Sequence, residues 1–271
     1  MQNLPKMCAK LLVFALCAQS AAAGAASAAC VFSRTMTVPP NPETETKSKH
    51  AYGLADGSAV FLGQLFVDAD GAPKAYHKND AVALDDLVNA GVPGNWWALA
   101  TDARDCGTAG KPLVQGPADP APGYYVAMTS MTNPAVGDCK VPRNYVDAQK
   151  IPYVALSQKI RAFDYVRNRG ALALVVNTVT GKRAFAVFAD QAPDYGFGEA
   201  SILLNRLVGN NPSPKTGGTD VRQNIIVVFK DTMGFPKNAG AVNTAAQKAF
   251  DAWGGEARLG ECATKVKAAP R

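Results

Sequence analysis

Short runs of apolar and β-branched residues recur along this chain, each bounded by Gly, Pro, Asn, Asp or Ser. Runs of this length and composition are typical of β-strands. Six segments fit the pattern: 58–71, 95–103, 123–131, 151–157, 171–190 and 224–229. The fifth is long enough for two strands, and Thr180 and Gly181 mark the turn of a hairpin between them. The pattern predicts a mostly β domain with a few helices.

Three segments instead show apolar residues at helical spacing. The first spans 81–90 after Asp80, the second 198–208, and the third starts near Thr244 and ends before Gly254. The side chains expected to face the core are Leu84, Leu87 and Val88; Ile202, Leu203 and Leu207; and Ala246, Ala249, Phe250 and Trp253. With no internal repeat or low-complexity linker, we expect one folded domain.

The first residues have the order of a secretory signal. Two lysines precede the apolar run 11–18, which is followed by the small residues of 21–30. A membrane anchor is the alternative, but the apolar run is far shorter than the ~20 residues a span requires. We therefore expect a signal peptide over 1–29, an extended polar arm over 30–52, a catalytic domain over 53–271, and no membrane partner after cleavage.

Cysteine usage agrees with export. Cleavage would leave four widely spaced cysteines and no CxxC pair, which is typical of two disulfides in an oxidising compartment. Of the three pairings we favour Cys106 with Cys139, inside the fold, and Cys30 with Cys262, joining the ends of the chain. Only two histidines are present, so we expect no zinc site, no other resident metal and no cofactor.

Charge is unevenly distributed. The full chain has a formal charge of +6, and loss of the two leader lysines would leave about +4. Seven acids and three bases lie between Asp68 and Asp105, whereas the chain from Ser201 onward has five acids and ten bases. The bases are scattered singly, without interleaved aromatics, so we expect no nucleic-acid partner. An anionic cell-wall polymer remains compatible with the basic total.

Two acids stand out around a Gly- and Pro-containing turn. Asp190 continues the face of Ala184, Ala186 and Phe188 at a strand end, where partial burial would raise its pKa. Glu199 falls in the first turn of the second predicted helix, where backbone N–H groups would favour the carboxylate. Both residues also fit structural roles, as a turn former and a helix-terminal acid. The chain lacks GxSxG, GxGxxG and Walker motifs, so carboxylate acid–base chemistry is the main catalytic hypothesis.

A second group of residues is suited to sugar binding. Asp68 and Asp70 lie two apart at a strand end, so they share a face and could bind a cation or a cationic sugar, although no EF-hand spacing surrounds them. Aromatic side chains stack on sugar faces, and strand alternation places one of Trp96 and Trp97 in the core. The predicted substrate-binding set is Asp68, Asp70, Tyr76, His77, Trp96, Tyr125 and Asp194.

Several motifs together resemble one enzyme family. DADG followed by AYH, then GNWW, QGPADPAPGYY, IPYVAL, FAD-x-x-P with GEAS close behind, and AWGG resemble the secreted bacterial chitosanases of glycoside hydrolase family 75. The similarity runs from about residue 52 to 255. It implies a six-stranded double-psi β-barrel and an inverting cleavage of β-1,4 links between glucosamine units. The family's essential Asp and Glu would fall on Asp190 and Glu199, with Glu199 as the acid and Asp190 as the base.

The turn between the two acids departs from the family pattern. It contains Asp194, Tyr195 and Phe197, and Asp194 is a candidate third acid of the site. The expectation is a monomeric, secreted or periplasmic endo-glycosidase acting on chitosan or a related amino-sugar polymer. Two alternatives remain open: hydrolysis of peptidoglycan glycan strands, and a carbohydrate-binding barrel without catalysis.

Overall fold

The computed structural model describes residues 29–160 and 169–269. The predicted signal peptide, 1–29, lies outside the described residues except for its last one. The eight strands of the described part are β1 (Phe32–Val38), β2 (Lys49–Leu54), β3 (Ala59–Asp68), β4 (Tyr153–Ala155), β5 (Ala171–Asn177), β6 (Arg183–Asp190), β7 (Glu199–Ser201) and β8 (Thr219–Thr232). The α-helices of the same part are α1 (Ile202–Leu207), α2 (Ala239–Trp253) and α3 (Gly255–Ala268).

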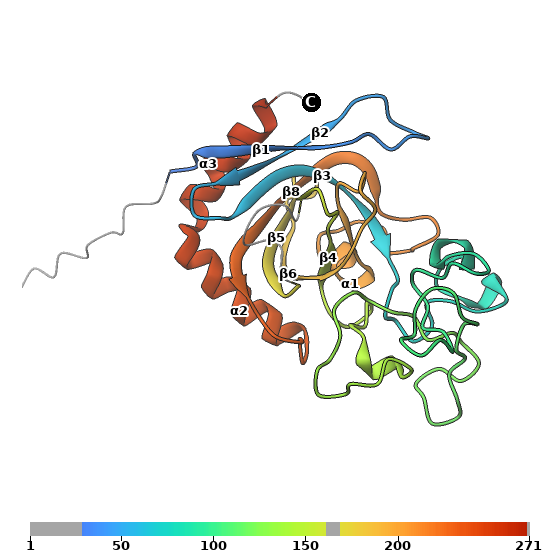
Figure 1. Cartoon of the computed structure of the whole chain (residues 1–271). Helices are drawn as coiled ribbons and strands as arrows, with labels where there is room; N and C mark the ends of the chain where they lie inside the picture. The colour runs from blue at the N-terminus through green and yellow to red at the C-terminus, as the bar shows by residue number, and fades with distance from the viewer. Residues whose placement is uncertain (1–28, 161–168, 270–271) are drawn as a thin grey trace, which may run out of the picture.

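Six of the strands close into a barrel (Figure 1). Around the ring the order is β3-β7-β4-β6-β5-β8, and pairing of β8 with β3 completes the closure. The β3–β7 and β4–β6 pairs are parallel, and the others are antiparallel. The prediction of a mostly β single domain with a few helices is confirmed, as is the closed six-stranded barrel that the family resemblance implied.

Alternation along β6 divides its side chains between two packing layers. Ala186 and Phe188 are completely buried inside the barrel, and Ala184 packs against the same cluster. Phe185 points outward to α2, where its ring lies 5.8 Å from that of Phe250. Closure of the barrel therefore protects both faces of this strand from water, which explains why it reads as a nearly continuous apolar run.

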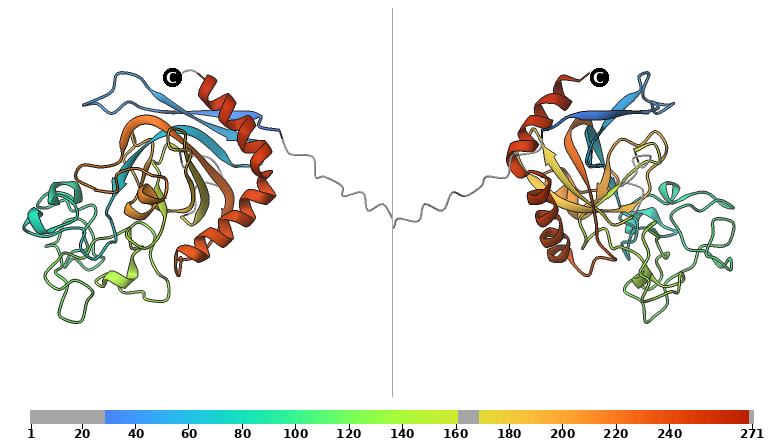
Figure 2. Two further views of the ribbon diagram at one scale, coloured as in Figure 1. Left: turned by 180° about the vertical axis from the view of Figure 1, so that it is seen from behind. Right: turned by 60° about the vertical axis from the view of Figure 1, so that its left-hand side comes forward.

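The predicted extended arm is a two-stranded hairpin. β1 and β2 pair antiparallel over Phe32–Val38 and Lys49–Leu54, and β2 continues the sheet onto β3. Figure 2 shows the hairpin lying across the barrel beside α3. Within the described part of the chain, regular structure thus begins at Phe32, about twenty residues before the expected start near Gly53. The polar side chains of β1, Ser33, Arg34, Thr35 and Thr37, are exposed, as is typical of an edge strand.

The first predicted helix, 81–90, is wrong. The segment forms two short 3-10 turns, Asp80–Val82 and Leu87–Ala90. Between them, the N–H groups of Leu84 and Asp85 donate to the carbonyls of Lys74 and Ala75, at 3.0 Å each. These bonds replace the i→i−4 bonds of a helix, and Leu84 and Leu87 pack against the core from an irregular loop. Val88, which was also predicted to face the core, is 65% exposed.

The other two predicted helices are partly right. The second is shortened, because 199–201 form strand β7 and only α1 follows, with Leu204 buried and Leu207 exposed. The third is α2, which begins earlier than expected and buries Ala246, Ala249, Phe250 and Trp253 as predicted. Gly254 then joins it to α3, a helix that the apolar pattern did not reveal.

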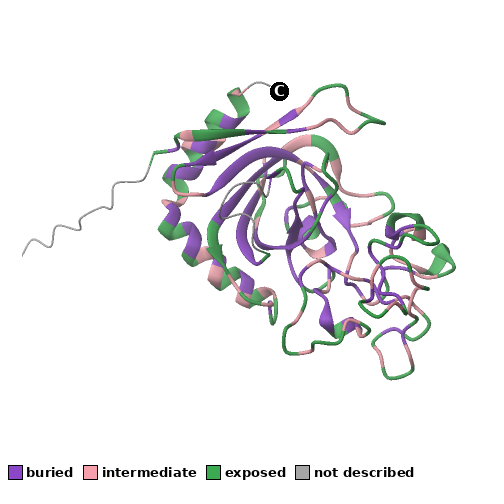
Figure 3. Cartoon of the chain, in the orientation of Figure 1, coloured by how far each residue is buried: buried purple, intermediate pink, exposed green. Residues whose placement is uncertain are grey.

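Residues 69–152 form a long, irregular region beside the barrel. The predicted strands at 95–103 and 123–131 are wrong: each forms only isolated bridges, such as Leu99 with Ala127. Their apolar side chains nevertheless pack in two clusters, the larger of which also includes barrel residues such as Val187 and Ala189, and Figure 3 shows this region alternating between buried and exposed segments. Frequent Gly, Pro and Asp residues interrupt the ladders before they can extend.

Both predicted disulfides are present. Cys30 pairs with Cys262, joining the segment before β1 to α3, and Cys106 pairs with Cys139 within the irregular region. Two disulfides are consistent with an exported protein. Among the described helices, none combines the length and the apolar composition needed to cross a bilayer.

The Cys30–Cys262 disulfide should contribute strongly to stability. It closes a loop with a sequence separation of 232 residues, so its loss frees a large part of the unfolded chain. Replacing both cysteines by Ser should cost about 2 to 4 kcal/mol and lower the melting temperature by roughly 5 to 15 °C in a circular-dichroism melt. The Cys106→Ser, Cys139→Ser double variant should cost less, because its loop spans only 33 residues. An unchanged melt for the first variant would contradict this role.

Candidate functional site

Asp190 ends β6 at the rim of the barrel. Its Oδ1 accepts hydrogen bonds from the backbone N–H groups of Ser130, at 2.9 Å, and Gln191, at 2.7 Å. The other carboxylate oxygen, Oδ2, is buried and has no hydrogen-bond partner among the described residues. Because a buried, unpaired carboxylate oxygen is costly, this atom marks a place where a proton or a ligand is expected.

Glu199 lies in a strand, which corrects its predicted place in a first helical turn. It begins β7, in register with Phe66 of β3 and Ala155 of β4. Gly198 precedes it with φ of +131°, and a Cβ there would lie only 1.9 Å from the Gln64 carbonyl oxygen. Only Gly fits this position, so Gly198 allows β7 to enter the barrel at the level of Glu199. Helix α1 starts after Ser201, so its backbone does not favour the carboxylate of Glu199.

The two acids flank the same residue of β4. Ala155 pairs with Asp190 on one side and with Glu199 on the other. Neighbouring strands lie about 4.8 Å apart, so two spacings place the backbones of Asp190 and Glu199 roughly 10 Å apart. The β4–β6 register shifts between Val154 and Ala155, and the charge of Asp190 raises the pKa of Glu199, so the two carboxyl groups lie within electrostatic reach of each other beside β4.

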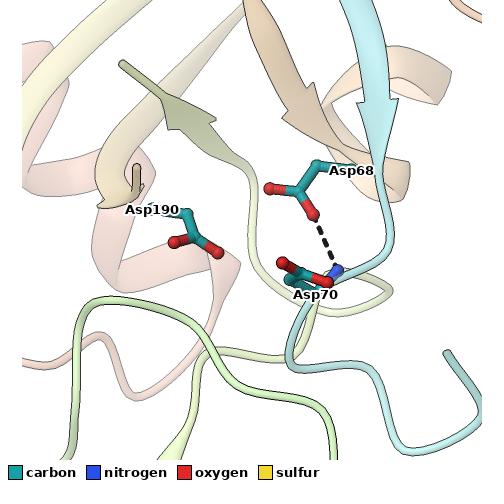
Figure 4. Close-up of side chains that lie close together, drawn as sticks. All are labelled: Asp68, Asp70 and Asp190. Atoms are coloured by element: carbon teal, nitrogen blue, oxygen red, sulfur yellow. Dashed lines mark hydrogen bonds between the residues drawn. The ribbon is translucent and has the colours of Figure 1, made fainter. Parts of the chain in front are cut away.

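Asp68 and Asp70 complete the group from the end of β3. Figure 4 shows their carboxylates converging with that of Asp190, and oxygens from all three lie within 4.8 Å of one another. Asp68 Oδ1 accepts the backbone N–H of Asp70 at 2.7 Å, and the hydroxyl of Tyr76 donates to Asp70 Oδ1 at 2.6 Å. The Tyr153 hydroxyl donates to the carbonyl of Asp70 at 3.0 Å. Asp68, Asp70, Asp190 and Glu199 are called the acidic cluster below.

Burial and mutual repulsion raise the pKa of every member of the acidic cluster. Burial, with the negative charge of Asp68, raises the pKa of Asp190 to about 8. Burial raises that of Asp68 to about 6. The pKa values of Asp70 and Glu199 lie well above their usual range, first through burial and then through Asp68 and Asp190. The cluster therefore retains protons at neutral pH, as closely placed carboxyl groups do.

The same three Asp residues could also hold a cation. Oxygens of Asp68, Asp70 and Asp190 are close enough to share one ion, and hard divalent cations prefer such ligands. The expectation of a protein without a resident metal remains a prediction. Retained protons and a bound cation are two ways of relieving the same repulsion, and they predict opposite responses to pH.

Tyr76, His77 and Tyr125 have different places around the cluster. Tyr76 is buried, and its hydroxyl positions Asp70 rather than facing solvent. His77 is half-buried, and its ring lies 5.0 Å from that of Tyr124. Tyr125 is half-buried and linked through its backbone N–H to the carbonyl of Tyr76 at 3.0 Å. Tyr76 therefore belongs to the site as a positioning residue.

Trp96 and Asp194 differ from their predicted roles. Trp96 is the buried member of its pair and packs in the core of the irregular region, whereas Trp97 is 55% exposed. The ring of Trp96 thus has little surface left for a sugar. Asp194 is exposed, and its carboxylate lies 3.7 Å from the Lys159 ammonium group. The structure does not bring it into the acidic cluster.

Three further residues that act on the acidic cluster were not predicted from the sequence. Asp85 is buried, and its charge helps to raise the pKa of Asp68 and Glu199. Tyr153 and Ser130 supply hydrogen bonds to the Asp70 carbonyl and to Asp190. The available signal was weak: Asp85 was one of seven acids in an acidic stretch, and Tyr153 followed a proline in a strand. Their grouping arises only when distant loops meet.

Searches against protein-family models and against curated proteins find no match to this chain.

Proposed function

We propose that this protein is an exported glycosidase that hydrolyses β-1,4 links in chitosan or a related amino-sugar polymer. The observation that supports this most directly is the placement of Asp190 and Glu199 on either side of Ala155, within a group of buried and half-buried acids. The motif resemblance to family 75 chitosanases supports the same substrate class. The two disulfides are compatible with a secreted or periplasmic location.

The spacing of the two acids suits inversion. Inverting enzymes hold their carboxyl groups about 6.5 to 9.5 Å apart, leaving room for a water molecule, whereas retaining enzymes hold them about 5 to 5.5 Å apart. Backbones roughly 10 Å apart are compatible with the longer range once the side chains incline toward each other. One group would protonate the leaving oxygen while the other activates water on the opposite face of the sugar.

The environments of the two acids favour Glu199 as the acid and Asp190 as the base. Burial and the charges of Asp68, Asp190 and Asp85 all raise the pKa of Glu199, which keeps it protonated. Asp190 instead accepts two backbone N–H bonds, from Ser130 and Gln191, that stabilise its ionised form. With a pKa of about 8, Asp190 is ionised in only a minority of molecules at neutral pH, and this ionised fraction is the form that can take up a proton from water.

The acidic cluster also offers a way for a positively charged substrate to bind a basic protein. Chitosan is a polycation, and a mature chain of about +4 would repel it overall. Asp68, with a pKa of about 6, is largely ionised at neutral pH, so it places negative charge where the polymer would bind and local attraction can offset the basic remainder. This argument favours chitosan over peptidoglycan, which would instead be attracted to the scattered basic surface.

The direct test is sugar release by the purified mature protein. We expect soluble oligosaccharides from chitosan, little or none from peptidoglycan, and initial products in the α-anomeric form by NMR. A β-anomeric product would exclude inversion. Sugar release from peptidoglycan but not from chitosan would show that the protein is instead a peptidoglycan glycan-strand hydrolase. Binding of either polymer without release would identify a carbohydrate-binding barrel.

A further inference from the structure

A cavity of about 240 Å³ lies next to Glu199 and is lined by residues from three separate parts of the chain. Gln64, Phe66 and Glu199 come from β3 and β7, Tyr195 from the preceding turn, and Glu45 from the β1–β2 loop. None of these lining residues was in the predicted substrate-binding set, and only Glu199 was a predicted site residue, as one of the two catalytic acids. The cavity opens beside the proposed catalytic acid, at the side of the barrel opposite Asp190 across β4.

Two exposed aromatic rings line this cavity. Phe66 is 45% exposed although it lies within barrel strand β3, near its end, and it pairs directly with Glu199. Tyr195 is 37% exposed. Exposing large apolar rings in a concave site is unfavourable unless a ligand covers them, and aromatic faces are well suited to the apolar face of a pyranose ring.

The hairpin fixes the remaining wall of the cavity. Lys49 is almost fully buried and forms an ion pair with Glu45, and its ammonium group also donates to the Tyr195 carbonyl at 3.0 Å. Gln64 Nε2 donates to Glu45 Oε1 at 3.3 Å, and the backbone N–H of Asn41 donates to Glu45 Oε2, the oxygen paired with Lys49, at 2.8 Å. These contacts link the β1–β2 loop to the turn that carries Tyr195. This hydrogen-bond network holds the cavity open.

We propose that this cavity is a sugar-binding subsite, in which Phe66 and Tyr195 stack on one ring of the polymer next to Glu199. Glu45 and Gln64 supply carboxylate and amide groups for its hydroxyl or amino substituents. The inference rests on the proposed function for its choice of ligand, an amino-sugar oligomer. It assigns substrate contact to Phe66 and Tyr195 in place of the buried Trp96.

The test is oligosaccharide binding measured by calorimetry in the Glu199→Gln background, so that hydrolysis cannot consume the ligand. The probe is a glucosamine hexamer. Phe66→Ala and Tyr195→Ala should each weaken binding about 10-fold, since each removes one stacking face. Tyr195→Phe and Phe66→Tyr, which keep the ring, should bind within about 2-fold of the parent. Val179→Ala, at an exposed apolar position of the β5–β6 turn, is the matched control and should leave affinity unchanged.

Chitosan hydrolysis is also measured for the same variants in a protein that retains Glu199. This second measurement distinguishes a failure of the subsite from a failure of the proposed function. If chitosan is cleaved but both alanine variants bind the hexamer as tightly as the parent, the subsite is wrong and the enzyme assignment stands. If chitosan is not cleaved but binding still depends on both rings, the subsite stands alone. Absence of hexamer binding to the parent, or an equal loss for Tyr195→Phe and Tyr195→Ala, would overturn the stacking role.

Discussion

Replacing Glu199 by Gln should lower kcat/KM for chitosan about 10²- to 10⁴-fold. Gln has nearly the same shape but cannot donate a proton to the leaving oxygen, and general acid–base groups contribute this order of magnitude. Asp190→Asn should reduce the rate by a similar factor, because the amide cannot activate water. Sugar release under initial-rate conditions measures both effects.

The control for these variants is an acid of the same type away from the site. Asp231, which is exposed near the end of β8, provides one. Asp231→Asn should retain the parent rate. Full activity in both Glu199→Gln and Asp190→Asn would refute the site. Loss in only one of them would refute the two-carboxylate mechanism, since inversion requires both groups.

Most of the barrel strands could be predicted because they carry the information locally, whereas their closure into a six-stranded barrel was expected only from the family resemblance. β3, β5, β6 and β8 are apolar on both faces or alternate strictly, and Gly181 marks the hairpin turn with φ of +69°. A closed barrel packed against helices demands such residues at nearly every position. Asp190 was also recognisable, because it interrupts an apolar face at a strand end.

The errors have a common physical origin in contacts between distant segments. The 81–90 segment has helical spacing, but its N–H groups bond to Lys74 and Ala75. Glu199 precedes a real helix, yet pairing with β3 and β4 draws 199–201 into the barrel. Trp96 and Trp97 are adjacent, so alternation shows that one is buried but cannot show which.

The sequence revealed the acidic cluster only as two separate pairs of acids. Asp68 and Asp70 were paired by their spacing, and Asp190 and Glu199 by the turn between them. Nothing local joins the two pairs, since closure of β3 onto β7 and of β4 onto β6 brings them together. Asp85 and Tyr153 join the group from further segments. The site is therefore a product of barrel closure rather than of any one motif.

The melting temperature should fall by more than about 10 °C as pH rises from 5 to 8.5. The folded state holds the pKa of Asp190 at about 8 and that of Asp68 at about 6, against ordinary values near 4 in the unfolded chain. Between these limits the folded state binds more protons than the unfolded state, so the free energy of unfolding decreases as pH rises. About four pKa units at Asp190 alone correspond to a loss on the order of 5 kcal/mol.

Asp190→Asn should flatten this pH dependence, because the amide stays neutral at every pH in the range. The variant should match the parent near pH 4.5 and melt at a higher temperature at pH 8.5, even though it has lost activity. Asp231→Asn should keep the parent's slope. A parent melt that instead rises toward pH 8.5, and collapses when EDTA is added, would show that the carboxylates are stabilised as anions. In that case a bound divalent cation, rather than shared protons, relieves the repulsion between Asp68, Asp70 and Asp190.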